Sequence, residues 1–413
     1  MKNLIKIFKI IYWRIKSFII RYYFGNPARK LKIVGVTGTS GKTTTATLLY
    51  KIALQLGYKA GLISTVEILA NGIDLQIEHK TPTTPDSVTL TKIFKKMVDE
   101  KCEYVFMEVS SHAVVQGRVA NVDFIGGIFT NFSQDHLDYH KNMEEYFEAK
   151  KKFFKMLSPG AFALANADDK YGDRMLEGIV AKPSLYGIEN KDVKFYGQIS
   201  KLDFSGLELI FNGQKINSKM LGKFNAYNLL AVWSTCSLLG FDMDKVNKIL
   251  ENVEPPRGRF EHFTSKGGVL IIVDYAHKPD ALEKVLSAVK EIKSGSGKII
   301  SVFGCGGDRD PFKRPVMGKI GVSMSDIAIF TSDNPRSEDP DVIIAQMKTN
   351  LSVEDLQKVK TIPNRHEAIR ESVKIAQNGD IILVAGKGHE DYQIIKGVKS
   401  HFDDMEELKE AFQ

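Results

Sequence analysis

TGTSGKTTT, residues Thr37 to Thr45, is the stretch that decides how the first part of this chain folds. It follows an apolar run over 31–36 and precedes ATLLYKIALQLG, which has the apolar spacing of a helix. A strand, a glycine loop and a helix start in this order form a phosphate cradle, because glycines let backbone N–H groups close on phosphate oxygens. The general P-loop has glycine where this chain has Val36, so the stretch predicts a variant P-loop that binds a nucleoside triphosphate.

The same stretch supplies side chains for a triphosphate and its metal ion. Lys42 can reach the terminal phosphates as a point charge, and the hydroxyl of Thr43 or Thr44 can hold Mg²⁺. The structural alternative is a plain glycine turn beside a surface lysine.

The composition is that of a globular protein with room for more than one domain. The chain has 413 residues, of which 43% are hydrophobic and 26% charged. Its three cysteines lie far apart, which fits a reducing cytoplasm and argues against a disulfide framework or a zinc site. Residues 1–32 hold nine Lys and Arg and no acid, so the net charge of +7 leaves −2 for the remainder. We therefore expect no nucleic acid among the partners of the body of the protein.

The N-terminal segment MKNLIKIFKIIYWRIKSFIIRYYFG has the pattern of a basic amphipathic helix. At 100° per residue, one face carries Leu4, Phe8, Ile11, Ile15, Phe18 and Tyr22, and lysines cluster opposite. The charges are too frequent for a membrane span, and no small-residue cleavage site follows. We expect residues 1–25 either to lie peripherally on the inner membrane surface or to pack against the body or a partner.

Short apolar strands alternate with helices along the rest of the chain, which predicts an α/β protein with parallel-rich sheets. The order is broken over 190–222, where a turn at Asn212-Gly213 predicts a β-hairpin insertion. Pro255 to Arg259 marks a domain boundary, after which strands and helices alternate again. We expect a helix and linker over 1–30, an ATP-binding domain over 31–256 and a second α/β domain over 257–413.

Polar residues follow two of the predicted strands. Glu108 stands at the carboxyl end of the strand YVFME, where open α/β sheets place ligands, and its carboxylate suits Mg²⁺. TNFSQDHLDYH, over 130–140, follows the next strand with closely spaced acids and histidines. Its His136 and His140 lack the HExxH spacing of a zinc protease. Taken singly, these residues have structural alternatives: a solvated acid at a strand end and a buried histidine.

Further motifs occur along the chain in the order found in one enzyme family. They are TGTSGKTT, TTP, MEVSSH, TNFSQDHLDYH, the lysine of EAK, FNAYN, GRFE, DYAH, GCGGDRD, DNPR and GKGHEDYQ. Together they resemble the Mur ligases over roughly residues 31–413, and most closely the branch that adds the third residue of the peptidoglycan stem peptide. The resemblance implies a Mur-ligase P-loop domain followed by a Rossmann-like α/β domain that binds the amino acid.

The resemblance implies an ATP- and Mg²⁺-dependent amide ligase. In this family ATP phosphorylates a carboxylate, an amino group attacks the acyl phosphate, and phosphate leaves. The phosphate-binding residues carried over are Gly38, Thr39, Ser40, Gly41, Lys42, Thr43 and Thr44, and those around the nucleotide are Asn228, Arg259, Asp274 and His277. The implied metal ligands are Thr43, Glu108, His136 and a carbamylated Lys150; Lys42, Lys150 and His136 are the implied catalytic residues.

The resemblance also implies the two substrates that are joined. The residues carried over for the muramoyl-dipeptide acceptor, UDP-MurNAc-dipeptide or a related muropeptide, are Thr83, Thr84, Ser110, Gln116 and Arg118. Those for the incoming amino acid are Arg309, Asp333, Asn334, Pro335, Arg336, Gly386 and Glu390. DNPR is the form associated with meso-diaminopimelate rather than L-lysine, because Arg336 can pair with the distal carboxylate that lysine lacks.

The sequence departs from the family pattern at its start, because it reaches the P-loop by Gly38. We therefore expect the usual domain that binds the UDP part of the acceptor to be absent. Either the enzyme uses the usual acceptor with weaker contacts to its UDP, or it uses a different, membrane-associated acceptor. Two other functions stay open: a related ligase such as a folylpolyglutamate synthetase, against which DNPR, TTP and GKGHEDYQ argue, and a non-catalytic protein on the same fold. Peptidoglycan precursor synthesis in the cytoplasm is the expected role.

Overall fold

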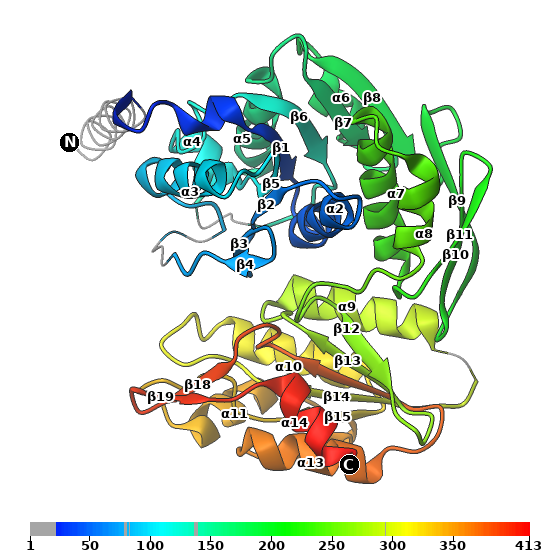
Figure 1. The fold of residues 1–413 in the computed structure, drawn as a ribbon. Helices are drawn as coiled ribbons and strands as arrows, with labels where there is room; N and C mark the ends of the chain where they lie inside the picture. The colour runs from blue at the N-terminus through cyan, green and yellow to red at the C-terminus, as the bar shows by residue number, and fades with distance from the viewer. Residues whose placement is uncertain (1–21, 78–80, 82, 136–138, 294) are drawn as a thin grey trace. The chain divides into compact units, whose positions relative to one another are not determined.

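The computed structural model describes residues 22–77, 81, 83–135, 139–293 and 295–413 (Figure 1). The chain divides into two compact units, which we describe separately. The first consists of Met1–Lys201, Glu208–Lys219 and Phe224–Val253, and the second of Leu202–Leu207, Met220–Lys223 and Glu254–Gln413. The predicted N-terminal helix falls almost entirely on residues 1–21, which lie outside the described residues.

An 11-stranded sheet forms the centre of the first unit, in the order β11-β10-β9-β8-β7-β6-β1-β5-β2-β3-β4. From β9 to β2 neighbouring strands pair in parallel, and β3 and β4 continue the sheet in antiparallel pairs. The strands are β1 Lys32–Thr37, β2 Ala60–Ile63, β3 Ile68–Ala70, β4 Ile73–Asp74, β5 Tyr104–Glu108, β6 Phe124–Phe129, β7 Phe162–Asn166, β8 Lys182–Gly187, β9 Phe195–Asp203, β10 Gly206–Phe211 and β11 Gln214–Ser218.

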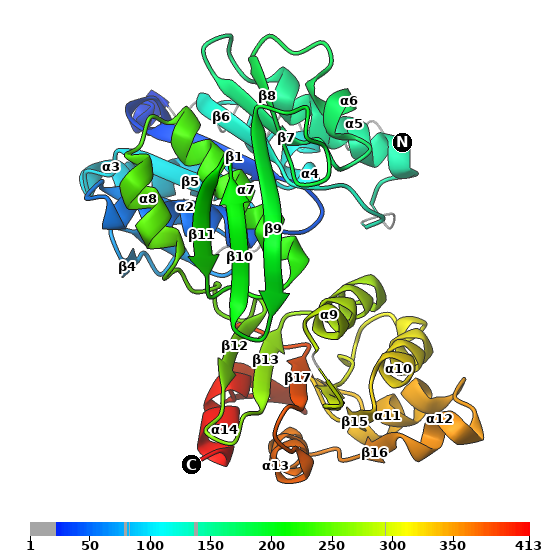
Figure 2. The same ribbon diagram turned by 90° about the vertical axis from the view of Figure 1, so that its right-hand side faces the viewer.

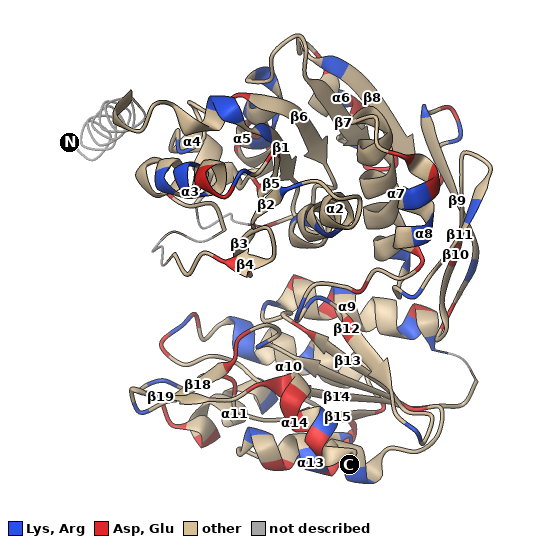
Figure 3. Ribbon diagram, in the orientation of Figure 1, with Lys and Arg blue, Asp and Glu red and all other residues tan. Residues whose placement is uncertain are grey.

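Helices accompany this sheet, and their starts are fixed by local capping. The carboxylate of Asp86 accepts the N–H groups of Val88 and Thr89 at the start of α3, and Asn142 caps α5 through the N–H of Glu145. The helices are η1 Pro27–Lys30, α2 Lys42–Gln55, α3 Ser87–Asp99, α4 Ser111–Val115, α5 Met143–Lys155, α6 Gly172–Leu176, α7 Lys223–Leu238 and α8 Met243–Leu250. Strands β6 and β7 carry no charged residue (Figure 3), as expected of parallel strands buried on both faces.

The predicted hairpin is present, but it is not a separate insertion. Strands β9, β10 and β11 lie side by side and extend the large sheet (Figure 2). Asn212 and Gly213 have φ angles of 44° and 86°, the left-handed pair that a tight hairpin turn requires. The helix that follows this hairpin is α7, which begins at Lys223.

The second unit is built on a six-stranded sheet in the order β12-β13-β17-β14-β15-β16, in which only β12 pairs antiparallel. Alternate residues of β13 belong to two separate apolar clusters, Leu270 and Ile272 to one and Ile271 and Val273 to the other. Both faces of the sheet are therefore covered, and the predicted α/β class with parallel-rich sheets is confirmed.

The remaining elements complete the second unit. The strands are β12 Glu261–Thr264, β13 Leu270–Asp274, β14 Ile299–Phe303, β15 Ile327–Phe330, β16 Val359–Thr361, β17 Ile381–Ala385 and, in a separate hairpin, β18 Tyr392–Ile395 and β19 Val398–His401. The helices are α9 Pro279–Ile292, α10 Lys313–Met324, α11 Pro340–Lys348, α12 Val353–Gln357, α13 Arg365–Ile375 and α14 Asp404–Ala411. Within the described part of the chain, no helix combines the length and the apolar character that crossing a membrane requires.

Candidate functional site

The glycine loop between β1 and α2 has the shape of a phosphate cradle. Gly38 and Gly41 have φ angles of 151° and 81°, which residues other than glycine rarely adopt. A Cβ on Gly38 would lie 1.9 Å from the Thr130 hydroxyl oxygen, and one on Gly41 would lie 2.4 Å from Oδ1 of Asn228. Both glycines are therefore required by close neighbours, and one of these neighbours is Asn228 of α7.

Asn131 holds the middle of this loop. Its Oδ1 accepts the Ser40 N–H at 2.9 Å, and its Nδ2 donates to the Ser40 carbonyl at 3.1 Å. Helix α2 then begins at Lys42, and its N-cap residue, Gly41, has no side chain to cap the first turn. The loop thus presents the positive end of α2, with Thr43 and Thr44 in its first turn, to an anion.

Two lysines converge on one carbonyl of the loop. Lys42 Nζ donates to the carbonyl oxygens of Gly38 and Thr39 at 3.0 and 2.9 Å, and Lys150 Nζ donates to that of Gly38 at 2.7 Å. Lys150, on α5, is only 2% exposed. Burial, assisted by the charge of Lys42, lowers the pKa of Lys150 well below its ordinary value, and Asp135 opposes this shift. An anion at the loop would offset the repulsion between the two ammonium groups, which fits a phosphate ligand.

Glu108 ends β5 next to the start of α2. Its carboxylate is buried and accepts hydrogen bonds from the Thr43 hydroxyl at 2.8 Å, the Thr65 N–H at 2.7 Å and the Thr65 hydroxyl at 3.1 Å. A carboxylate and a hydroxyl at this separation are oxygen donors of the kind that Mg²⁺ prefers. Two of the predicted metal ligands, Thr43 and Glu108, are thereby in direct contact.

The predicted metal set also contains Lys150, which lies on α5, and His136. His136 lies outside the described residues, as does Asp138 of the same motif. Among the residues that are described, no three His, Cys, Asp or Glu side chains come together as metal ligands. His140 of the same motif is buried, shares a hydrogen bond of 3.0 Å with the Ser111 hydroxyl of α4, and has its ring centre 5.0 Å from that of Tyr146 of α5.

The residues predicted for the acceptor form one hydrogen-bonded network. The Thr84 hydroxyl donates to the Glu108 carbonyl at 3.0 Å and accepts the Ser110 N–H at 3.0 Å. Arg118 donates to the Thr84 carbonyl at 2.6 Å and, through Nε and Nη2, to Gln116 Oε1 at 3.0 and 2.6 Å. Thr83 adjoins the network through a 3.2 Å hydrogen bond between its hydroxyl and that of Thr65.

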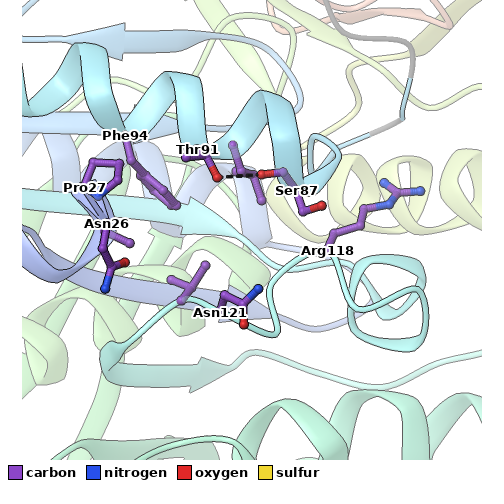
Figure 4. A pocket seen from close by; sticks show the side chains of 10 residues that line it. Asn26, Pro27, Ser87, Thr91, Phe94, Arg118 and Asn121 are labelled. Atoms are coloured by element: carbon purple, nitrogen blue, oxygen red, sulfur yellow. Dashed lines mark hydrogen bonds between the residues drawn. The ribbon is translucent and has the colours of Figure 1, made fainter. Parts of the chain in front are cut away.

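Arg118 also borders a small pocket between η1 and α3. Figure 4 shows Arg118 at one end of the lining residues and Asn26 and Pro27 at the other, with Ser87 and Thr91 of α3 between them. Burial lowers the pKa of Arg118, although Asp86 opposes the shift, so an anionic ligand group at this guanidinium would be stabilised by a partly desolvated charge.

In the second unit, three residues predicted around the nucleotide lie close together. Asp274 ends β13 and accepts the Phe260 N–H at 2.8 Å, while burial raises its pKa to about 6 against the charge of Arg259. The Arg259 guanidinium lies 4.9 Å from the centre of the Tyr275 ring, and its buried Nε has no hydrogen-bond partner among the described residues. His277 follows on the same loop and shares a 2.8 Å hydrogen bond with the Tyr275 carbonyl. The orphaned Nε marks a place for a ligand acceptor atom.

The residues predicted for the amino acid meet at the carboxyl ends of β15 and β17. Asn334 donates to Glu390 at 2.9 Å and to Asp333 at 3.2 Å, and a Cβ on Gly386 would lie 2.8 Å from Asp333 Oδ2. Burial raises the pKa of Glu390, and the neighbouring Asp333 adds to this shift. A buried acid, Asp333, beside a partly buried one, Glu390, forms a site that an ammonium group would stabilise.

Arg336 lies on the same loop in a left-handed conformation, with a φ of 53°. Its Nη1 donates to the Gly307 carbonyl at 2.7 Å, and Gly307 in turn donates to the Asn334 carbonyl at 2.9 Å. Pro335, between them, is buried, whereas Arg309 is exposed on the loop after β14. The loop after β15 therefore carries a negative group, Asp333, and a positive group, Arg336.

Two charged residues of this region were not predicted as site residues from the sequence. Lys387 stands in the quoted motif GKGHEDYQ, has a side chain that is 0% exposed and lies 3.7 Å from a Glu390 oxygen. Arg365, in NRHEA, carried no motif signal at all, because its contacts are with segments far away in the sequence.

Comparisons with known proteins agree with the geometry of both units. Residues 36–236 match the Mur ligase middle domain, and residues 258–388 match the Mur ligase, glutamate ligase domain. The chain is 50% identical to the UDP-N-acetylmuramoyl-L-alanyl-D-glutamate–2,6-diaminopimelate ligase of Parabacteroides distasonis over 95% of its own length and 80% of that protein. It is also 50% identical to the enzyme of that name from Bacteroides thetaiotaomicron, over 94% of the chain and 80% of the relative.

Solved structures show the same fold. A 2,6-diaminopimelate ligase of the same name aligns with a TM-score of 0.68 and 33% identity, over 92% of this chain and 78% of that one. A folylpolyglutamate synthase from Thermotoga maritima aligns with a TM-score of 0.69 over 94% of both chains, but at 15% identity it shows a likeness of fold alone.

Proposed function

The chain belongs to the Mur ligase family, and we propose that it joins 2,6-diaminopimelate, as the meso isomer, to the D-glutamate of UDP-N-acetylmuramoyl-L-alanyl-D-glutamate. Its 50% identity to ligases of that name over nearly the whole chain carries the proposal. The site formed by Asp333 and Arg336 of one loop and Glu390 of another supports it, because a diamino dicarboxylic acid offers both an ammonium group and a second carboxylate to these residues. This reaction is a step in peptidoglycan precursor synthesis.

Mur ligases use ATP and Mg²⁺, and the residues of the first unit fit both. When bound, ATP supplies the phosphoryl group that activates the acceptor carboxylate, and Mg²⁺ neutralises the charge of its phosphates. The loop from Gly38 to Thr44 would hold the phosphates through its backbone N–H groups. Lys42 would exchange its bonds to the Gly38 and Thr39 carbonyls for phosphate oxygens. Thr43 and Glu108 would hold the metal ion, together with His136.

We propose that Lys150 acts as a carbamate. Its lowered pKa favours the neutral amine, which is the form that adds to CO₂; a C–N bond forms and one proton leaves. The product is a carboxylate on a buried side chain, which places a negative charge beside Lys42. Such a group is an oxygen ligand suited to a second Mg²⁺.

The acceptor and the amino acid would be held by different units of the chain. In the first, Arg118 would pair with an acidic group of the acceptor, and Thr84 and Ser110 would orient it. In the second, the carboxylates of Asp333 and Glu390 would hold an ammonium group and Arg336 the distal carboxylate. The pairing with Arg336 selects diaminopimelate over lysine, since a lysine would leave the guanidinium without its partner.

Phosphate release tests the proposal. The purified protein is supplied with ATP, Mg²⁺ and UDP-N-acetylmuramoyl-L-alanyl-D-glutamate, and meso-diaminopimelate, L-lysine and no amino acid are compared. We expect turnover that depends on diaminopimelate. Equal turnover with lysine would contradict the assignment of Arg336, and no turnover with any of them would show that the acceptor is wrong and favour a folylpolyglutamate-type or other related ligase.

The basic N-terminal segment adds a second proposal about partners. We propose that residues 1–25 bring the enzyme to an anionic membrane surface, because their sequence pairs an apolar face with a lysine-rich one. The protein with and without these residues is floated with vesicles of anionic and of neutral lipid. Flotation with anionic vesicles should require residues 1–25; equal flotation of both proteins would contradict it.

A further inference from the structure

A fully buried ion pair lies behind the proposed amino-acid site. Arg365, the first residue of α13, donates from Nε and Nη2 to the two carboxylate oxygens of Asp404 at 2.7 Å each. Both side chains are 0% exposed. Asp404 is the first residue of α14, whose first turn is acidic (Figure 3). A buried, bidentate pair of this kind fixes the guanidinium in one orientation.

The remaining donors of Arg365 reach two other segments. Nη1 donates to the Ser332 carbonyl at 3.3 Å, and Nη2 also donates to the Ala385 carbonyl at 3.1 Å. Ser332 immediately precedes Asp333, and Ala385 immediately precedes Gly386. One guanidinium therefore ties together the two loops that carry the predicted amino-acid residues. It does so across the sheet, because β14 lies between β15 and β17.

The charge of Arg365 also acts on the acids of those loops. Burial would lower the pKa of Arg365, yet the pKa lies above its ordinary value because Asp404, Asp333 and Glu390 stabilise the charged form. The same attraction favours the ionised carboxylate of Glu390. Glu390 is faced as well by Lys387, which favours its ionised form, and by Asp333, which disfavours it; Arg336 acts in the same direction as Lys387.

We propose that Arg365 is a positioning residue for the incoming amino acid: it sets the spacing of the Ser332–Arg336 and Ala385–Glu390 loops, so that the carboxylates of Asp333 and Glu390 together face the ligand's ammonium group. This inference rests on the function proposed above. The competing view is that Arg365 only joins α13 to α14 and stabilises the unit.

A matched control separates the two views. Arg370 lies on the same helix and pairs with Glu410 of α14 at 3.2 Å, but both side chains are more than half exposed, at 52% and 64%. Arg365→Met, Arg365→Lys and Arg370→Met are compared in the full-length protein. Lysine keeps the charge but cannot make four hydrogen bonds in the fork geometry of arginine.

Steady-state kinetics with ATP, Mg²⁺ and the muramoyl dipeptide supply the first readout. We expect both Arg365 variants to raise KM for diaminopimelate by about tenfold or more, with KM for ATP changed less than about twofold, and Arg370→Met to change neither. In Arg365→Met the acidic limb of kcat/KM for diaminopimelate should move to higher pH, because Glu390 loses a cation that favours its ionised form. Equal changes for both substrates and an unmoved pH profile would reduce Arg365 to a structural role.

Hydrogen–deuterium exchange supplies a readout that does not depend on the substrate. Exchange should rise in both loops, 332–336 and 385–390, in the Arg365 variants and in neither loop in Arg370→Met. If wild-type protein does not use diaminopimelate, the proposed function fails while exchange still tests the tie between the loops. If Arg365→Met does not fold, Arg365→Lys carries the same comparison. Unchanged exchange in both loops would overturn the proposal.

Discussion

Replacing Arg336 by alanine should separate recognition of diaminopimelate from use of ATP. The guanidinium donates to the Gly307 carbonyl at 2.7 Å, and the backbone N–H of Arg336 donates to the Ile394 carbonyl at 2.9 Å. Alanine keeps the backbone bond to β18 and loses only the side chain. It also keeps the left-handed backbone, with its φ of 53°, so backbone strain changes little.

The size of the effect follows from the lost charge pair. Leaving the distal carboxylate of the ligand without a partner costs about 2–5 kcal/mol, and about 1.4 kcal/mol corresponds to a factor of ten. Because Arg336 is only half-buried, the lower end applies, which predicts a loss of roughly 30-fold in kcat/KM for diaminopimelate. L-lysine has no distal carboxylate, so its far slower use should be nearly unaffected.

Initial rates of phosphate release measure this directly, with diaminopimelate and lysine each varied at saturating ATP. Arg370→Ala, an exposed arginine of the same unit, is the control and should behave as wild type. A proportional loss with both amino acids would show that Arg336 supports the loop rather than the ligand. Unchanged kinetics with diaminopimelate would refute the assignment of Arg336 to the distal carboxylate of the amino acid.

Three further predictions test other parts of the site. Lys150→Ala should lose at least about 100-fold in kcat, and formate or acetate should restore part of it if a carboxylate is what the carbamate supplies; a lack of any loss would exclude a catalytic role. Asn131→Ala removes two hydrogen bonds from Ser40 and should raise KM for ATP about 5- to 30-fold, the effect of roughly 1–2 kcal/mol, without changing KM for diaminopimelate. Asp274 has a folded pKa of about 6 against an ordinary 3.8, so its contribution to stability is present at low pH and is lost as pH rises from about 4 to 6. Asp274→Asn should therefore gain stability relative to wild type by up to ~3 kcal/mol between pH 4 and pH 7 in urea unfolding, and a constant difference would contradict the shift.

The parts of the fold that follow from local sequence were predictable. Gly38 and Gly41 stand where the backbone turns tightly after an apolar run, and Asn212-Gly213 specifies its hairpin turn by conformation alone. Edge elements were not predicted: β4 has two exposed residues and β16 has three residues with no apolar alternation. Such strands are set by pairing with a neighbour, which leaves little periodicity in their own sequence.

In the candidate site too, residues with a local sequence signal were predicted, and a residue defined by distant contacts was not. Lys42, Thr43 and Glu108 carry their chemistry in their immediate sequence, and the structure brings Thr43 and Glu108 into contact. Arg365 could not be found, because each of its partners lies 20 or more residues away and the helix containing it has an ordinary amphipathic pattern. A buried arginine reveals itself only through the carbonyl groups that it satisfies, and those are known once the strands are in register.

The two lysines at the Gly38 carbonyl connect phosphate binding to the proposed carbamate. Both ammonium groups donate to the Gly38 carbonyl oxygen, so Lys42 and Lys150 repel each other when both are charged. Burial of Lys150 lowers its pKa and therefore favours the loss of its proton. Addition of CO₂ to Lys150 would turn this repulsion into attraction and would place a carboxylate within reach of the loop. The charge of Lys42 would then favour both that carboxylate and phosphates held by the loop. Carbamylation and nucleotide binding should therefore favour each other through Lys42, and replacing Lys42 by methionine should weaken both.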